Sequence, residues 1–112
     1  LYFVAHEQIR KMIESGEIIF TSALSIFEIR RKLMKEKVAQ ERIKQVLEFI
    51  KSRSVVVDIT PMVSENAALF SIEHKLAAID ALIYASAQES NATLITADND
   101  FRGLQGTTVL SA

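Results

Sequence analysis

Residues 77–85 read Ala-Ala-Ile-Asp-Ala-Leu-Ile-Tyr-Ala, and residues 93–101 read Thr-Leu-Ile-Thr-Ala-Asp-Asn-Asp-Phe. The first segment has the spacing of a helix, and apolar residues at i+3, i+4 and i+7 put Asp80 beside its buried face. The second is a short β-rich run that ends just before Asp98. A buried carboxylate needs a partner, and α/β sheets bind ligands at the carboxyl ends of their strands. The two acids therefore suggest a shared cation.

The rest of the chain alternates between predicted helices and strands. Helices are expected at 2–15, 22–35, 38–52 and 61–74, and around Asp80 up to Asn91. Strands are expected at 17–21, 54–59, 93–97 and 107–110. The helices at 22–35 and 38–52 are predicted to form a hairpin. Strands that alternate with helices imply a parallel sheet.

Composition limits the class of protein. A chain of 112 residues is one domain, and 49% apolar with 24% charged residues is typical of a folded globular protein. The lack of cysteine removes disulfides and thiolate metal sites, so zinc is not expected. No apolar run approaches the ~18 to 20 residues of a membrane span, and no signal peptide is recognisable, which predicts a cytoplasmic protein without a membrane. A net charge of −1 does not by itself indicate a nucleic-acid binder.

Each candidate acid also has an ordinary structural interpretation. Ser25 and Glu28 fit a capping box, and Glu28 shares a polar helix face with basic residues. Asp80 could cap a helix or interact with its dipole. Asp98 and Asp100 could belong to a turn, which Asp and Asn favour. These alternatives stay open on the residues alone.

Basic residues gather on the helix that carries Glu28. Most such runs are solvated faces, yet a carboxylate site flanked by cations is what metal-assisted cleavage of a polyphosphate would use. The residues are Arg30, Arg31, Lys32, Lys35 and Lys37, with Arg42 and Lys44 beyond them. No phosphate loop, dinucleotide fingerprint, serine elbow or catalytic cysteine is present.

Three segments carry a resemblance to a known family: Phe-Thr-Ser-Ala-Leu-Ser-Ile-Phe-Glu-Ile at 20–29, Lys-Leu-Ala-Ala-Ile-Asp-Ala-Leu-Ile at 75–83 and Leu-Ile-Thr-Ala-Asp-Asn-Asp-Phe at 94–101. In order and spacing the chain resembles the PIN-domain family, and especially the VapC-type toxin ribonucleases, from about Glu17 to its end. The resemblance implies a three-layer, Rossmann-like α/β fold in which helices flank a small parallel sheet.

The resemblance also implies a site and a reaction. Acids at the places of Glu28, Asp80 and Asp98 would bind magnesium or manganese and be catalytic, with Asp100 as a fourth contributor. The implied reaction is hydrolysis of RNA phosphodiester bonds by an endoribonuclease, the toxin of a type II toxin–antitoxin pair. The implied partners are RNA, a cognate antitoxin and a second copy in a homodimer. Thr96 would orient water or a neighbouring acid, or be an ordinary strand residue.

The chain departs from the family pattern at its start. PIN domains begin with a central strand that carries a further Asp, whereas residues 2–15 are predicted to be the helix after it. We therefore expect residues 1–112 to be a single, N-terminally truncated PIN-like domain that lacks this strand and its Asp. The alternative function is a degenerate, non-catalytic PIN domain that binds RNA or protein. Metal affinity would separate the two.

Overall fold

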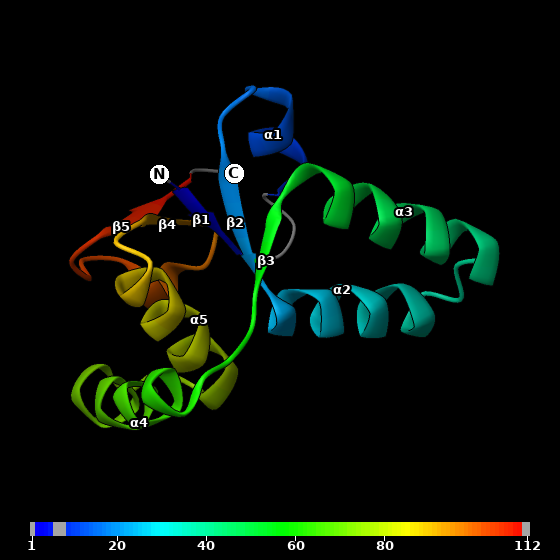
Figure 1. Ribbon diagram of the computed structural model, residues 1–112. Helices are drawn as coiled ribbons and strands as arrows, with labels where there is room; N and C mark the ends of the chain where they lie inside the picture. The colour runs from blue at the N-terminus through cyan, green and yellow to red at the C-terminus, as the bar shows by residue number, and fades with distance from the viewer. Residues whose placement is uncertain (1, 6–8, 111–112) are drawn as a thin grey trace.

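The computed structural model describes residues 2–5 and 9–110, and it shows a parallel five-stranded sheet flanked by helices (Figure 1). The strand order is β3-β2-β1-β4-β5, and each neighbouring pair is parallel. The strands are β1 (Tyr2–Val4), β2 (Ile19–Ser22), β3 (Val55–Val57), β4 (Thr93–Thr96) and β5 (Thr107–Val109). The predicted α/β fold class is confirmed.

The helices agree with the predicted ranges after the first element. In the described part of the chain they are α1 (Ile9–Glu14), α2 (Ala23–Lys35), α3 (Gln40–Arg53), α4 (Pro61–His74) and α5 (Ala78–Glu89), and residues Asn99–Phe101 form the 3₁₀ turn η2. Thr60 caps α4 by accepting a hydrogen bond from the Val63 N–H at 3.2 Å, and proline fits its first turn. Helices α2 and α3 pack as the predicted hairpin (Figure 1). Within the described ranges, none of the helices has the length and apolar character needed to cross a bilayer.

The prediction for the first element is wrong. Residues 2–4 form β1 instead of a helix, and among the described residues of this region the helical ones are Ile9–Glu14. Strand β1 pairs with β2 on one side and β4 on the other, so it is the central strand that the chain was expected to lack. Phe3 and Val4 are both fully buried, because a central parallel strand is covered on both faces. No carboxylate lies among described residues 2–5, and residues 6–8 lie outside the described part.

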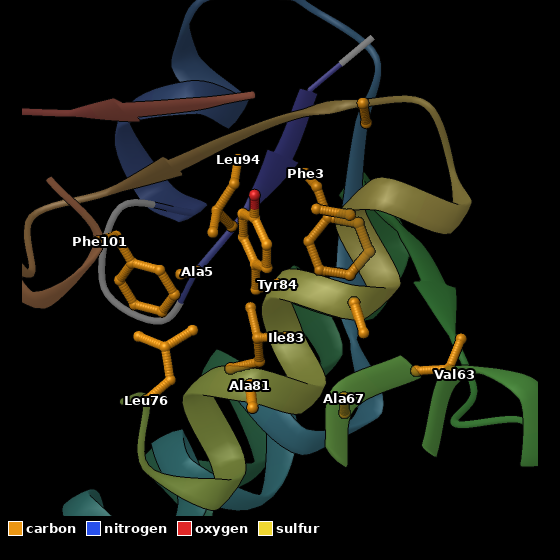
Figure 2. Close-up of a cluster of buried hydrophobic side chains, with 13 residues drawn as sticks. Phe3, Ala5, Val63, Ala67, Leu76, Ala81, Ile83, Tyr84, Leu94 and Phe101 are labelled. Atoms are coloured by element: carbon orange, nitrogen blue, oxygen red, sulfur yellow. The ribbon is translucent and has the colours of Figure 1, made fainter. Parts of the chain in front are cut away.

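Alternate strand residues enter two separate cores. Phe3 and Leu94 face the side where α4 and α5 pack, and Figure 2 shows them beside Tyr84 and Ile83 of α5. Their neighbours Val4 and Ile95 face the other side, against side chains of α1, α2 and α3. This period of two is the geometry of a pleated strand. The sheet is therefore the middle of three layers. The residues that follow the strands lie at its carboxyl edge.

Candidate functional site

Three aspartates meet at the carboxyl edge of the sheet. One carboxylate oxygen from each of Asp80, Asp98 and Asp100 lies within 4.8 Å of those from the other two. Asp80 is in the first turn of α5 and is half-buried, whereas Asp98 and Asp100 are exposed between β4 and the end of η2. The structure thus brings together the two segments that the sequence analysis singled out.

Local hydrogen bonds shape the turn that carries two of these acids. Asp98 is the N-cap of η2, and its Oδ1 accepts a hydrogen bond from the Asp100 N–H at 2.9 Å. The Asp98 N–H in turn donates to Oγ1 of the buried Thr96 at 3.1 Å. Thr96 therefore contacts the backbone of a neighbouring acid, which is one of the two roles considered for it. The turn is held from both ends before any ligand is involved.

Helix α5 is tied to the loop that follows η2. The Tyr84 hydroxyl donates to the Gln105 carbonyl at 2.8 Å, and Gln88 Nε2 donates to the same oxygen at 3.1 Å. Burial raises the pKa of Tyr84, and the charge of Glu73 adds to the effect. Sequence reasoning missed these contacts because Tyr84 and its acceptor are 21 positions apart. They connect the helix of Asp80 with the segment of Asp98 and Asp100.

Two further features make this connection rigid. Phe101, at the end of η2, is 1% exposed and is part of the core with Tyr84 and Leu76 (Figure 2). Gly106 has φ of +77°, and a Cβ there would lie 2.7 Å from Gln88 Nε2. Only glycine combines this left-handed backbone with so close a neighbour. Substitutions in this loop would therefore disturb the base of the aspartate cluster.

Glu28, the fourth predicted site residue, is carried by α2. It is half-buried in α2, and it does not belong to the group of three carboxylates found among the described residues. Its capping-box interpretation is wrong, because the N-cap of α2 is Ser22, whose Oγ accepts from the Leu24 N–H at 3.0 Å. Ser25 is inside the helix and fully buried. A ligand role for Glu28 stays a prediction.

The aspartate cluster fits a hard divalent cation. Magnesium lies 2.0–2.1 Å from its oxygen ligands, so two ligands on opposite sides of the ion are about 4.2 Å apart, close to the spread of this cluster. Several carboxylates this close repel each other, and a divalent cation removes that repulsion. The site has no nitrogen or sulfur donor in its group. Asp80, Asp98 and Asp100 would be the residues that hold the ion.

The predicted basic surface is confined mainly to α2. Arg30, Arg31 and Lys35 are exposed along it. On α3, by contrast, acids lie between the cations, and Lys51 Nζ pairs with Glu48 Oε1 at 3.0 Å. Acids so placed reduce the attraction of α3 for a polyanion. The α2 surface is therefore the better candidate for a phosphate-binding or partner-binding role.

Comparison with known proteins agrees with this architecture. Residues 4–106 match the family model of the PIN domain. A toxin–antitoxin complex from Klebsiella pneumoniae superposes with a TM-score of 0.79 at 20% identity, covering 97% of each chain. VapBC2 from Rickettsia felis, bound to a DNA fragment from its promoter, gives 0.75 at 18%, covering 97% of this chain and 96% of that one.

A third similar structure is VapC20 of Mycobacterium tuberculosis, a toxin that cleaves the sarcin–ricin loop. It superposes with a TM-score of 0.69 at 16% identity and covers 94% of this chain and 95% of its own. A search of curated proteins gives no match. The sheet order, the edge where the acids meet and the match over residues 4–106 agree with one another. The chain belongs to the PIN domain family, and its fold is that of the VapC-type toxins.

Proposed function

We propose that this protein is a divalent-metal-dependent endoribonuclease that hydrolyses RNA phosphodiester bonds in the cytoplasm, as the toxin of a type II toxin–antitoxin pair. The observation that carries the proposal is the convergence of Asp80, Asp98 and Asp100 within 4.8 Å at the carboxyl edge of a PIN-fold sheet. Ligand sites of open α/β sheets lie at this edge. Cleavage of the sarcin–ricin loop by VapC20, a toxin of the same fold, supports RNA as the substrate class.

The roles proposed for the residues follow from their positions. Asp80, Asp98 and Asp100 bind Mg²⁺ or Mn²⁺, and Glu28 is proposed as a further metal-binding and catalytic residue. The bound cation supplies activation of water and compensation of charge on the phosphoryl oxygens. The Thr96 hydroxyl accepts a hydrogen bond from the Asp98 N–H, and this bond fixes the backbone position from which the Asp98 side chain extends. The Tyr84–Gln105 hydrogen bond keeps α5 and the η2 loop in register, so that the three carboxylates face one position.

The test is cleavage of a circular, structured RNA by the purified chain. With Mn²⁺ or Mg²⁺ the circle should open to linear fragments, because an endonuclease needs no free end. With EDTA the circle should stay intact. Cutting that persists in EDTA would contradict metal-dependent chemistry.

One observation favours the alternative, a PIN domain that binds RNA or protein without cutting. Strand β1 is the central strand, yet none of the described residues 2–5 at this position is acidic. A cluster with fewer carboxylates would hold a cation more weakly. In the same assay the alternative predicts RNA that is bound but uncut at every metal concentration.

We also propose where the cognate antitoxin binds. A groove along α2 has an apolar floor of Ile26, Phe27 and Met34 and a basic rim, formed by Arg30, Arg31 and Lys35. Phe27 and Met34 are about half exposed although they are one heptad apart on one face of α2. An apolar groove with cations on its rim is complementary to an amphipathic helix that carries acidic residues. The Klebsiella pneumoniae and Rickettsia felis structures are toxin–antitoxin assemblies, which supports a protein partner of this kind.

Phe27→Glu should weaken the complex with the co-expressed cognate antitoxin by about 30-fold or more. The substitution removes a central apolar contact and puts a carboxylate opposite the acidic residues proposed for the antitoxin helix. Ile18→Glu, at an exposed apolar residue that does not line this groove, is the matched control and should leave the affinity unchanged. Calorimetric titration of each purified variant with antitoxin measures the difference. Equal affinities for the two variants would move the antitoxin away from α2.

A homodimer completes the proposal. The outer face of α4 exposes Met62, Leu69 and Ile72, and Ile72 is 82% exposed. Apolar side chains gathered on one face commonly mark a protein interface. Sedimentation of the purified chain as a monomer at micromolar concentration would contradict self-association.

A further inference from the structure

Arg102 lies on the same turn as two of the site aspartates. It is the C-cap of η2, and its backbone N–H donates to the Asn99 carbonyl at 3.0 Å. Its guanidinium is held by the side chain of the same residue. Nε donates to Asn99 Oδ1 at 3.2 Å and Nη2 donates to that oxygen at 2.8 Å. A long, exposed side chain is thus held at the end of the turn that carries Asp98 and Asp100.

The acceptor of these hydrogen bonds is neutral. An amide oxygen orients the guanidinium without cancelling its positive charge, unlike a carboxylate. A guanidinium has five N–H donors, and two are used here, so three remain for another ligand. The side chain is exposed, and those donors can therefore be reached from solvent. This combination is that of an oriented cation with unused donors.

The backbone under Arg102 is rigid. The preceding residue, Phe101, is buried in the core, and the Leu104 N–H donates to the Phe101 carbonyl at 3.1 Å. The following residue, Gly103, has φ of +86°, a left-handed conformation that glycine adopts readily. A preorganised site loses less conformational freedom when it binds a ligand. The backbone that carries the Arg102 guanidinium is therefore held in place by the fold.

Charge decides what such a group can bind. A polyanion that approaches Asp80, Asp98 and Asp100 is repelled by them unless cations compensate. Arg102 adds a positive charge on the same turn, and a guanidinium binds phosphate through two parallel hydrogen bonds. RNA is the polyanion on which the proposed function acts. The group that Arg102 would bind is therefore a phosphate of the RNA backbone.

We infer that Arg102, oriented by Asn99, is a substrate-contacting residue that binds a backbone phosphate of the RNA strand beside the aspartate cluster. The inference rests on the proposed nuclease function. Asn99 acts through Arg102 and is a positioning residue. Neither side chain binds the metal.

The experiment measures RNA binding and Mn²⁺ binding separately. Binding of a fluorescein-labelled single-stranded RNA is followed by fluorescence anisotropy in Ca²⁺ at several salt concentrations. Arg102→Gln should bind RNA at least about tenfold more weakly, because a charge-assisted contact is lost, and its salt slope should fall by about 0.7. Arg102→Lys should restore the slope but only part of the affinity, since an ammonium cannot form the two parallel bonds. Asn99→Ala should weaken binding about threefold, because the charge stays but its orientation is lost.

Arg53→Gln is the matched control. Arg53 ends α3 just before β3 begins, at the opposite edge of the sheet from the aspartates, and its guanidinium stacks 5.2 Å from the centre of the Phe49 ring. The same loss of charge there should leave RNA affinity within about twofold of the wild type, because that edge is far from the cluster. If Arg102→Gln binds RNA as well as Arg53→Gln does, the inference is overturned.

Calorimetric titration with Mn²⁺ tests whether Arg102 binds phosphate or only stabilises the turn. Removing a nearby positive charge cannot reduce attraction for a cation, so Arg102→Gln should bind Mn²⁺ at least as tightly as the wild type. Weaker Mn²⁺ binding would show that Arg102 supports the turn and would overturn the inference. Failure of the wild type to cut RNA would overturn the proposed nuclease function, while the anisotropy data would still decide the role of Arg102.

Discussion

Asp98→Asn should lower metal-dependent RNA cleavage by at least about 100-fold while the protein stays folded. The expected loss follows from a cation that contributes several kcal/mol to stabilising the transition state, when each 1.36 kcal/mol is tenfold in rate. The fold should survive because Asn retains an Oδ1 that can accept the Asp100 N–H, as Asp98 does at 2.9 Å. Asp80→Asn and Asp100→Asn should have losses of the same kind, because their carboxylates share one position.

The stability of these variants gives a second, independent readout. Without metal, Asp98→Asn and Asp100→Asn each remove repulsion among three crowded carboxylates, so the free energy of unfolding should be unchanged or higher. Mn²⁺ should raise the free energy of unfolding of the wild type, because a ligand that binds the native state stabilises it. The increase should be smaller for Asp98→Asn. Urea denaturation with and without Mn²⁺ measures both effects.

Asp58→Asn is the control for the cleavage experiment. Asp58 follows β3 at the same carboxyl edge of the sheet, but it is not a member of the aspartate group. The chemical change is identical, and cleavage should stay within about twofold of the wild type. Wild-type activity in Asp98→Asn, or an equal loss in Asp58→Asn, would refute the assignment of the metal-binding residues.

Phe101→Ala should lower the free energy of unfolding by about 3–5 kcal/mol, the usual result of deleting a buried phenyl ring. Phe101 is 1% exposed and fills the core beneath η2, next to Leu76 and Ala5 (Figure 2). Its removal leaves a cavity under the turn that carries Asp98 and Asp100. We therefore expect Mn²⁺ affinity to fall as well, because the turn loses its anchor.

Phe27→Ala is the matched control for this prediction. The Phe27 ring is 48% exposed on α2, so its deletion should cost less than about 1 kcal/mol. Urea denaturation of both variants, with Mn²⁺ titration at a temperature where each is folded, measures the two effects. Equal losses of stability would show that Phe101 does not anchor the site.

Much of the fold could be predicted from local patterns. Helix α4 was predicted at 61–74, the range that the structure shows, because Pro61 fits the first turn of a helix. The β-rich runs before Ser22 and Asp98 were likewise found near their observed ends. These elements are marked by a proline at a helix start or by a β-rich composition, and such signals are local.

The central strand could not be found in this way. Strand β1 has three residues and is buried on both faces, so it shows neither the alternation of a half-exposed strand nor a cap. Tyr2 and Phe3 followed by later apolar positions fit a helical spacing equally well. Only pairing with β2 and β4, which are distant along the chain, makes this segment a strand. Propensity is a weak prior where tertiary pairing decides.

In the candidate site, too, local sequence patterns and tertiary contacts determined different features. By itself the sequence determined that Asp80 would begin a helix and that Asp98 would follow a strand, because those placements depend on neighbouring residues. Asp100 was expected only from the family resemblance, and the tertiary structure groups its carboxylate with those of Asp80 and Asp98 and leaves Glu28 outside that group. Only the tertiary structure shows that Tyr84 reaches Gln105. Such convergence depends on how α5 packs against the sheet and on where the η2 loop is held. These are long-range contacts, and local sequence patterns do not encode which distant side chains will meet.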